Sequence, residues 1–259
     1  MPAGTTDPRP AIAATISPLV SSGAFVDVRA ALERLSQLGY RGAQLSASDP
    51  ATRPRDLGAS ARRDLAAALA RAELACSGVD LFIPPAHFTD AAFVARAVDA
   101  SVAAIGLAAD LGRAPLVLPL PTDASADVRA ALEAEASRRG VAVVVPLDGA
   151  SPDEASFADH PPYVRGVDCA AVLAAGGRPE AVVAALGGRL GGVRLVDLLR
   201  SGLRGPILEP RASRLDALAL RIALEVAGFR GLPVVDARQW GDPAEGIAAS
   251  IARWRELAT

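Results

Sequence analysis

The chain has 259 residues, of which 51% are hydrophobic, and a formal net charge of −2. This length suits one large α/β barrel or two smaller domains, and the nearly balanced charge gives no electrostatic basis for binding nucleic acid or an anionic membrane. All 27 basic residues are arginine, which excludes Schiff-base chemistry because that needs a lysine amine.

Short β-rich runs alternate with longer helical runs along the chain. The predicted strands are residues 11–16, 42–47, 74–83, 115–120, 141–147, 163–168, 192–198 and 232–237. Helices are predicted over residues 25–39, 60–73, 90–112, 125–140, 169–188 with a break at Gly176-Gly177, 213–228 and 242–257. Ser60, Asp90 and Asp242 are the expected N-caps of three of these helices.

Eight strands that alternate with helices predict parallel pairing. About 250 residues is the size of a (β/α)₈ TIM barrel. A doubly wound open sheet is the alternative, but the turn after the first strand (SPLVSSG, 17–23) lacks the glycine-rich phosphate motif of that fold. Because no linker interrupts the chain, we expect a single-domain α/β TIM barrel over residues 1–259, with residues 1–10 as a flexible N-terminus.

The cysteines and the lack of targeting segments favour a cytoplasmic location. Cys76 and Cys169 form no CxxC pair, which fits a reducing compartment. The N-terminus lacks the features of a secretory signal, and no apolar run reaches the ~20 residues of a membrane span. We therefore expect a cytoplasmic protein that binds neither membrane nor nucleic acid. A homo-oligomer remains possible, because outer barrel helices look alike whether they face water or a neighbour.

Polar residues stand where the predicted strands end, and chemistry in a TIM barrel is placed at those ends. They are Gln44, Ser46, Asp80, His87, Asp148, Asp168, Arg194, Asp197 and Asp236. A single aspartate at a strand end is as easily a helix cap as a functional group. Several on one face of a barrel favour a shared site.

Several segments resemble, in their order, the xylose isomerase-like TIM barrels, which form the sugar isomerase/epimerase and endonuclease IV superfamily. They are residues 38–46, 107–112, 139–149, 163–176, 191–198 and 220–236. The resemblance covers nearly the whole chain, and its most specific parts are LGYRG (38–42) and ALEVAGFRGLPVVD (223–236). It implies sugar isomerisation or epimerisation assisted by a divalent metal such as Mn, Mg or Zn.

The resemblance also implies four metal ligands, whose positions fall here on Pro146, Asp168, Arg194 and Asp236. The family has Glu, Asp, His and Glu at these positions, so the proline and the arginine each remove a ligand. Arginine stays protonated and has no lone pair for a metal. A divalent metal is therefore possible but disfavoured, and no cofactor is expected.

We instead expect Arg194 to be a central cation between Asp168 and Asp236, with these three as the catalytic residues if the protein is an enzyme. Two close carboxylates cannot both stay ionised without a nearby positive charge, and a guanidinium supplies that charge with several donors. The alternative is that Arg194 points outward or pairs only with Asp148 or Asp197.

The expected substrate-binding residues are His87, Asp148, Asp197, Glu209 and Trp240. For His87 and Trp240 the alternative is a structural role in a loop. Two functions remain open at this point. The first is an isomerase or epimerase that acts on a small carbohydrate or polyol with altered or lost metal dependence. The second is a non-catalytic barrel that binds a small molecule or a partner, as a pseudoenzyme does.

Overall fold

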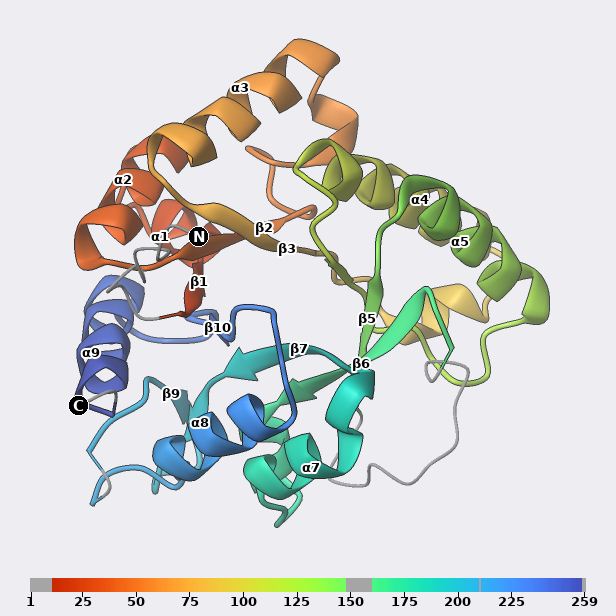
Figure 1. Ribbon diagram of the computed structural model, residues 1–259. Coiled ribbons are helices and arrows are strands. Elements are labelled where there is room, and N and C mark those ends of the chain that lie inside the picture. The colour runs from red at the N-terminus through yellow and green to blue at the C-terminus, as the bar shows by residue number, and fades with distance from the viewer. Residues whose placement is uncertain (1–10, 148–159, 210, 258–259) are drawn as a thin grey trace, which may run out of the picture.

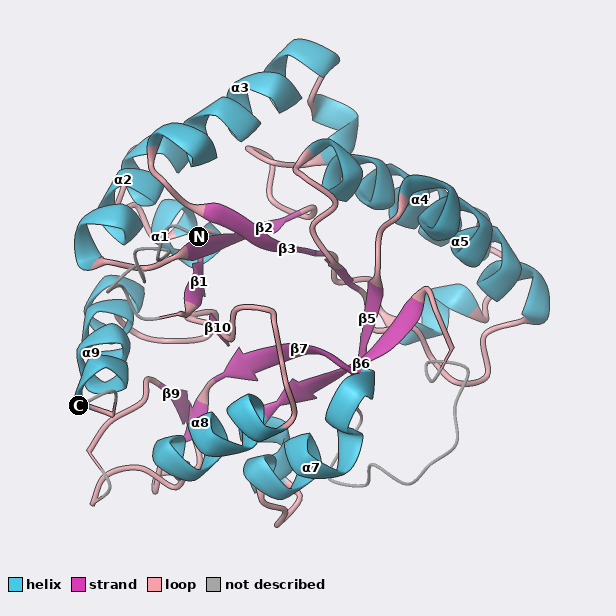
Figure 2. Cartoon of the chain, in the orientation of Figure 1, coloured by secondary structure: helices cyan, strands magenta, loops and turns pink. Residues whose placement is uncertain are grey.

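The computed structural model describes residues 11–147, 160–209 and 211–257. Eight strands close into a parallel barrel in the order β1-β10-β7-β6-β5-β4-β3-β2. Helices surround the barrel, which Figure 1 shows approximately along its axis. Figure 2 shows the strands in the middle and the helices outside them. The predicted TIM barrel is therefore confirmed. The expected flexible N-terminus, residues 1–10, lies outside the described residues.

The barrel strands are β1 (Ala13–Thr15), β2 (Gly42–Ser46), β3 (Ala75–Asp80), β4 (Leu116–Val117), β5 (Val143–Pro146), β6 (Tyr163–Asp168), β7 (Leu190–Leu195) and β10 (Val234–Val235). The α-helices are α1 (Ser17–Ser21), α2 (Val28–Leu38), α3 (Ala59–Arg71), α4 (Val94–Asp110), α5 (Ala126–Arg139), α6 (Cys169–Ala174), α7 (Pro179–Leu186), α8 (Ala217–Val226) and α9 (Pro243–Glu256). Short 3₁₀ helices are η1 (Pro54–Asp56), η2 (Pro85–Phe88) and η4 (Gly187–Arg189). Within the described residues, none of these helices has both the length and the apolar character needed to cross a bilayer.

Two of the three predicted helix caps are wrong. Helix α3 begins one residue before Ser60, and its cap position is Gly58. Helix α4 begins later than predicted because the Asp90 carboxylate accepts a hydrogen bond from the backbone of Ala92, which makes a turn before the helix. Asp242 caps α9 as predicted, with a proline at the first helical position.

The predicted strand over residues 192–198 is divided in the structure. Strand β7 ends at Leu195, and β8 (Asp197–Leu198) pairs antiparallel with β9 (Arg204–Gly205) instead of joining the barrel. A turn at Gly202, whose φ of 83° suits glycine, closes this hairpin. The hairpin matters for the site because it carries Arg204.

Side chains alternate along the strands between an outer and an inner surface. The outer surface packs against the helices in one hydrophobic core, to which the strands contribute Ala43, Leu45, Val79, Val143, Val145, Val193, Leu195 and Val235. Neighbouring positions, such as Gln44 and Arg194, instead line the inside of the barrel. The alternation thus places the polar strand residues in the barrel interior.

Candidate functional site

Three aspartates and three arginines meet at the C-terminal end of the barrel, and we call them the Arg–Asp cluster. Its members are Asp80 at the end of β3, Asp168 at the end of β6, Arg194 in β7, Arg204 in β9, and Asp236 and Arg238 after β10. The parallel barrel strands bring five of these residues together because these strands end at the same face of the barrel, and the β8–β9 hairpin adds Arg204.

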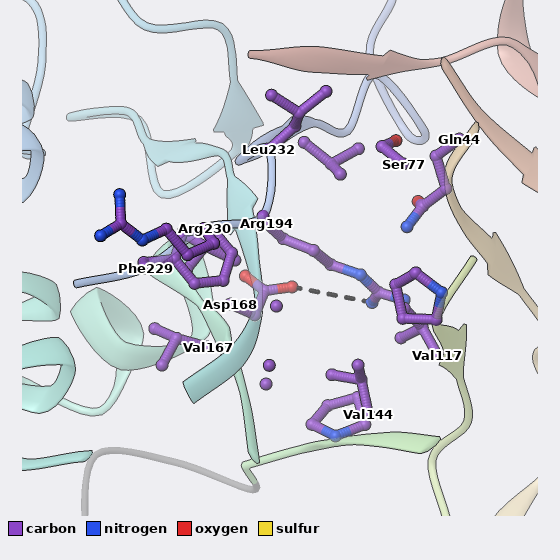
Figure 3. A pocket seen from close by; sticks show the side chains of 18 of the residues that line it. Gln44, Ser77, Val117, Val144, Val167, Asp168, Arg194, Phe229, Arg230 and Leu232 are labelled. Carbon is purple, nitrogen blue, oxygen red and sulfur yellow. Dashed lines mark ion pairs between the residues drawn. The ribbon is translucent and has the colours of Figure 1, made fainter. Parts of the chain in front are cut away.

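Arg194 contacts all three aspartates. Its Nη2 donates a hydrogen bond to Asp80 Oδ1. Its Nη1 lies 3.9 Å from Asp168 Oδ2, and its Nε lies 3.7 Å from Asp236 Oδ2. Figure 3 shows the side chain crossing the barrel interior, with the ion pair to Asp168 drawn as a dashed line. The guanidinium thus lies among the carboxylates, and Asp80 is a third partner beside the two that the sequence indicated.

Arg238 joins two of the aspartates. Its Nε and Nη2 donate to the two oxygens of Asp236 at 2.8 and 2.5 Å, which is the bidentate geometry of a strong arginine–carboxylate pair. Its Nη1 donates to Asp80 Oδ2 at 2.5 Å. Both oxygens of Asp80 and both oxygens of Asp236 therefore accept hydrogen bonds from, or lie close to, arginine nitrogens.

Arg204 completes the cluster from the β8–β9 hairpin. Its Nη2 donates to Asp168 Oδ2 at 2.7 Å. The other oxygen of Asp168 accepts from the backbone nitrogen of Ala171 at 3.1 Å and caps α6. Asp168 therefore has the structural role of a helix cap and a place in the cluster at the same time.

The charges of the cluster balance, with three carboxylates against three guanidinium groups. Burial by itself would raise the pKa of Asp236, but the hydrogen bonds and charge of Arg238, together with the charge of Arg194, hold that pKa below its usual value. Burial would likewise lower the pKa of Arg238, yet pairing with Asp236 and Asp80 raises it. Asp236 is therefore ionised at neutral pH and poorly suited to take up a proton.

The cluster does not fit a divalent metal. Mg²⁺ and Mn²⁺ need several free oxygen ligands, and the carboxylate oxygens here already face guanidinium nitrogens. At an effective dielectric constant of about 20, a dication about 4 Å from the Arg194 guanidinium would be repelled by about 8 kcal/mol. Across the described residues, no group of three or more His, Cys, Asp or Glu side chains is arranged to hold an ion. The expectation that no metal is bound stays a prediction.

Asp197 lies apart from the cluster and has a structural role. Its side chain is fully buried, and its Oδ1 accepts hydrogen bonds from the backbone nitrogens of Leu215 at 2.8 Å and Arg214 at 3.1 Å. The carboxylate thereby holds the turn that precedes α8 against the start of β8. This arrangement leaves it no access to a substrate, so the predicted binding role is replaced by a structural one.

Replacing Asp197 with alanine is expected to lower the free energy of unfolding by about 2–3 kcal/mol, because buried backbone donors lose a charged acceptor. Urea unfolding at neutral pH measures this change. The matched control is Asp216→Ala, which removes the exposed N-cap of α8 and should cost about 1 kcal/mol. Equal effects of the two substitutions would contradict the structural assignment of Asp197.

Two other predicted binding residues also lie away from the cluster. His87 stacks on Phe93 with ring centroids 4.5 Å apart and an angle of 13° between the rings, as expected for a structural loop residue. Glu209 is exposed on the turn that follows the β8–β9 hairpin. Asp148 lies outside the described residues.

Trp240 lines a cavity of about 540 Å³ between the β8–β9 hairpin and the start of α9. Arg204 lines the same cavity, which therefore lies beside the cluster, and so do Asp242 and Glu245. The indole Nε1 of Trp240 is buried and has no hydrogen-bond partner within the described part of the chain. The volume is in the range of small-molecule sites.

Sequence reasoning did not assign roles to Asp80, Arg204 or Arg238. Asp80 was among the polar residues predicted near strand ends, and the structure shows that β3 ends at this residue, as β6 ends at Asp168. Arg238 comes two residues after Asp236, close enough to reach the same carboxylate. Arg204 had no such signal, because β8 was predicted as the end of the preceding strand and β9 was not predicted.

No protein-family model matches the sequence, and no curated protein matches it either. Solved structures match nearly the whole chain. D-allulose 3-epimerase from Methylomonas sp. has a TM-score of 0.67 and 17% identity, covering 96% of this chain and 98% of that one. A sugar phosphate isomerase/epimerase from Parabacteroides distasonis has a TM-score of 0.71 and 13% identity (98% and 96% covered). The 3-keto-D-glucoside 4-epimerase from E. coli has a TM-score of 0.70 and 15% identity (96% and 100% covered). The chain thus shares its TIM-barrel fold with these solved structures.

Proposed function

We propose that this barrel binds a small carbohydrate or polyol at its C-terminal mouth without a divalent metal, and that Arg194 stands where related barrels place the metal. The observation that carries the proposal is the contact of one guanidinium with three buried aspartates at the strand ends. The fold supports the class of ligand, since a structure that shares it is D-allulose 3-epimerase in complex with D-allulose.

The cluster favours binding over catalysis. Epimerisation needs a base that can take a proton from carbon, and such a base works best with a pKa near the working pH. The pKa of Asp236 is instead lowered by its arginine partners. At the end of β5, the position that carries a glutamate in the resembled family is Pro146, which has no acid or base. We therefore infer a binding protein of the pseudoenzyme type.

The cavity beside the cluster has the groups that recognise a sugar. Arg204 can donate hydrogen bonds to hydroxyl oxygens, and the unpartnered Nε1–H of Trp240 can donate one more. Asp242 and Glu245 can accept from hydroxyl groups.

The test is calorimetric titration of D-allulose, D-fructose and sorbitol into protein treated with EDTA. We expect at least one of them to bind with an affinity that neither EDTA nor added Mn²⁺ changes, and no conversion of the two ketoses. Trp240→Phe should weaken binding about tenfold, because one hydrogen bond is lost from a buried site. The control is Trp254→Phe. Trp254 is the second tryptophan of the chain and lies in α9, so this substitution should leave the affinity unchanged.

Three results would count against this function. Binding that disappears with EDTA and returns with Mn²⁺ would show a metal-dependent protein. Conversion of D-fructose or D-allulose would show an active epimerase. Failure of all three compounds to bind would reject the class of ligand.

A further inference from the structure

We propose that the barrel interior, on the N-terminal side of Arg194, is a second binding site that takes a small neutral molecule with an apolar body and one hydroxyl group. A cavity of about 240 Å³ occupies this region. It shares no lining residue with the cavity beside Trp240. The two sites are therefore separate.

The position of the lining residues places the cavity toward the N-terminal end of the barrel. Ala75 is the first residue of β3, Pro115 directly precedes β4, and residues 229–232 precede β10. Asp168 and Arg194, near the ends of their strands, close the other side. The cavity thus reaches the face of the barrel opposite the mouth.

Some inward positions of the barrel carry no side chain. Gly166 and Gly192 are paired in neighbouring strands, and both line the cavity. Bulky branched residues usually fill the interior of a TIM barrel in layers. Val144 fills the space directly beside the two glycines, since an added Cβ would lie 2.8 Å from its Cγ1 at Gly166 and 3.1 Å at Gly192. The cavity is what remains of the layer beyond Val144.

Three residues that line the cavity each have a buried polar atom without a hydrogen-bond partner among the described residues. These atoms are the Oε1 of Gln44, the Oγ of Ser77 and the Nε of Arg194. The Gln44 residue is only 3% exposed. Figure 3 shows the guanidinium of Arg194 extended toward the wall that carries Gln44 and Ser77. Buried polar groups are nearly always paired in native proteins, so three such atoms around one cavity indicate a bound partner.

The chemistry of these atoms selects a hydroxyl group. A hydroxyl can donate to Gln44 Oε1, and it can either donate to Ser77 Oγ or accept from it. A carboxylate would meet the acceptor of Gln44 and the carboxylate of Asp168, which lines the cavity beside Arg194. An ammonium group would meet the guanidinium of Arg194. The head group is therefore neutral.

The remaining walls select an apolar body of limited size. They are formed mainly by Pro115, Val117, Val144, Pro146, Phe229, Leu232 and Val234. Arg230 also lines the cavity, and its guanidinium points away from Gln44 (Figure 3). Cys76 also lines the cavity, and burial raises the pKa of its thiol to about 12, so that it is uncharged. The volume equals that of about eight water molecules, which suits seven or eight non-hydrogen atoms. A sugar would leave several hydroxyl groups unpaired against these walls.

The test compares benzyl alcohol, toluene and benzoate, which share a ring and differ in the head group, by ligand-observed NMR on the full-length protein. We expect benzyl alcohol to bind with a Kd of about 1 mM or lower, and the other two at least about tenfold more weakly. Gln44→Leu should weaken benzyl alcohol binding about tenfold without weakening toluene binding. Gln37→Leu, on the exposed face of α2, is the matched control and should change nothing.

Two further variants, Val117→Phe and Trp240→Phe, test the location of the binding site. Val117→Phe should fill the cavity and abolish binding, and it serves if Gln44→Leu does not fold. Trp240→Phe should leave benzyl alcohol binding unchanged, which separates this site from the proposed sugar site. Equal binding of the three compounds, no binding of benzyl alcohol, or indifference to both Gln44→Leu and Val117→Phe would overturn the proposal.

Discussion

Replacement of Arg194 by methionine is expected to lower the free energy of unfolding by about 3–5 kcal/mol at pH 7, the usual cost of removing one partner from a buried ion pair. The side chains of Asp80 and Asp236 are each 4% exposed, and that of Asp168 is 11% exposed. Without Arg194, these three carboxylates share only two guanidinium groups, and Asp80 loses a direct hydrogen bond. Urea unfolding followed by circular dichroism measures the change.

The control for this substitution is Arg138→Met, which breaks an exposed pair with Glu135 on α5. Exposed pairs contribute about 0–1 kcal/mol, so this variant should resemble the wild type. Mn²⁺ should raise the stability of the Arg194→Met variant and leave that of the wild type unchanged, because an ion can occupy a site from which the guanidinium is removed. A loss as small as that of the control would mean that Arg194 does not hold the cluster together.

Replacement of Asp236 by asparagine is expected to cost about 3 kcal/mol at pH 7, and this cost should shrink in acid. Asp236 accepts hydrogen bonds from the Nε and Nη2 of Arg238, and it lies close to Arg194. Its pKa in the folded protein is below the value of about 3.9 that an unfolded chain has. Its ionisation therefore stabilises the fold above pH 4, and that contribution is lost as the pH falls through the folded pKa.

The measurement for Asp236 is urea unfolding of the wild type and the variant between pH 7 and pH 2.5. The difference should stay constant down to about pH 5 and then shrink. Asp110→Asn removes the partner of Arg62 from an exposed pair and should show a small difference throughout. A difference for Asp236→Asn that does not depend on pH would show that its charge is not what stabilises the cluster.

Under the proposed function, the cluster explains how a barrel can keep aspartates at its strand ends without a metal. Carboxylates that face each other across a mouth require positive charge, whatever its source. An inorganic ion leaves coordination positions open for a substrate, whereas a guanidinium occupies the carboxylates with its own hydrogen bonds. The proposed replacement of a metal by Arg194 keeps positive charge among the carboxylates and removes the free oxygens on which metal-assisted chemistry depends.

The fold could be predicted because the alternation of short apolar strands and long helices is regular over the chain. The strands are shorter than the apolar runs suggested, and prolines contribute to this. Pro119 ends the run that contains β4, and Pro233 directly precedes β10. Proline has no N–H with which to continue a ladder. The β8–β9 hairpin was missed because Asp197 was read as the continuation of the apolar run of β7.

The site could be predicted as far as it follows from strand ends. Asp168, Arg194 and Asp236 meet because parallel strands end at one face, and this rule needs no knowledge of side-chain contacts. Arg204 could not be found in this way, because its place depends on a hairpin fold. The buried role of Asp197 depends on a turn 17 and 18 residues further along the chain, which no local pattern indicates.

The most direct test of the central claim is a crystal structure of the wild-type protein soaked in Mn²⁺, with anomalous diffraction to locate the ion. The account predicts no anomalous peak within ligand distance of Asp168 and Asp236, and electron density for the Arg194 guanidinium among Asp80, Asp168 and Asp236. A peak between these carboxylates, with the guanidinium displaced from them, would contradict it.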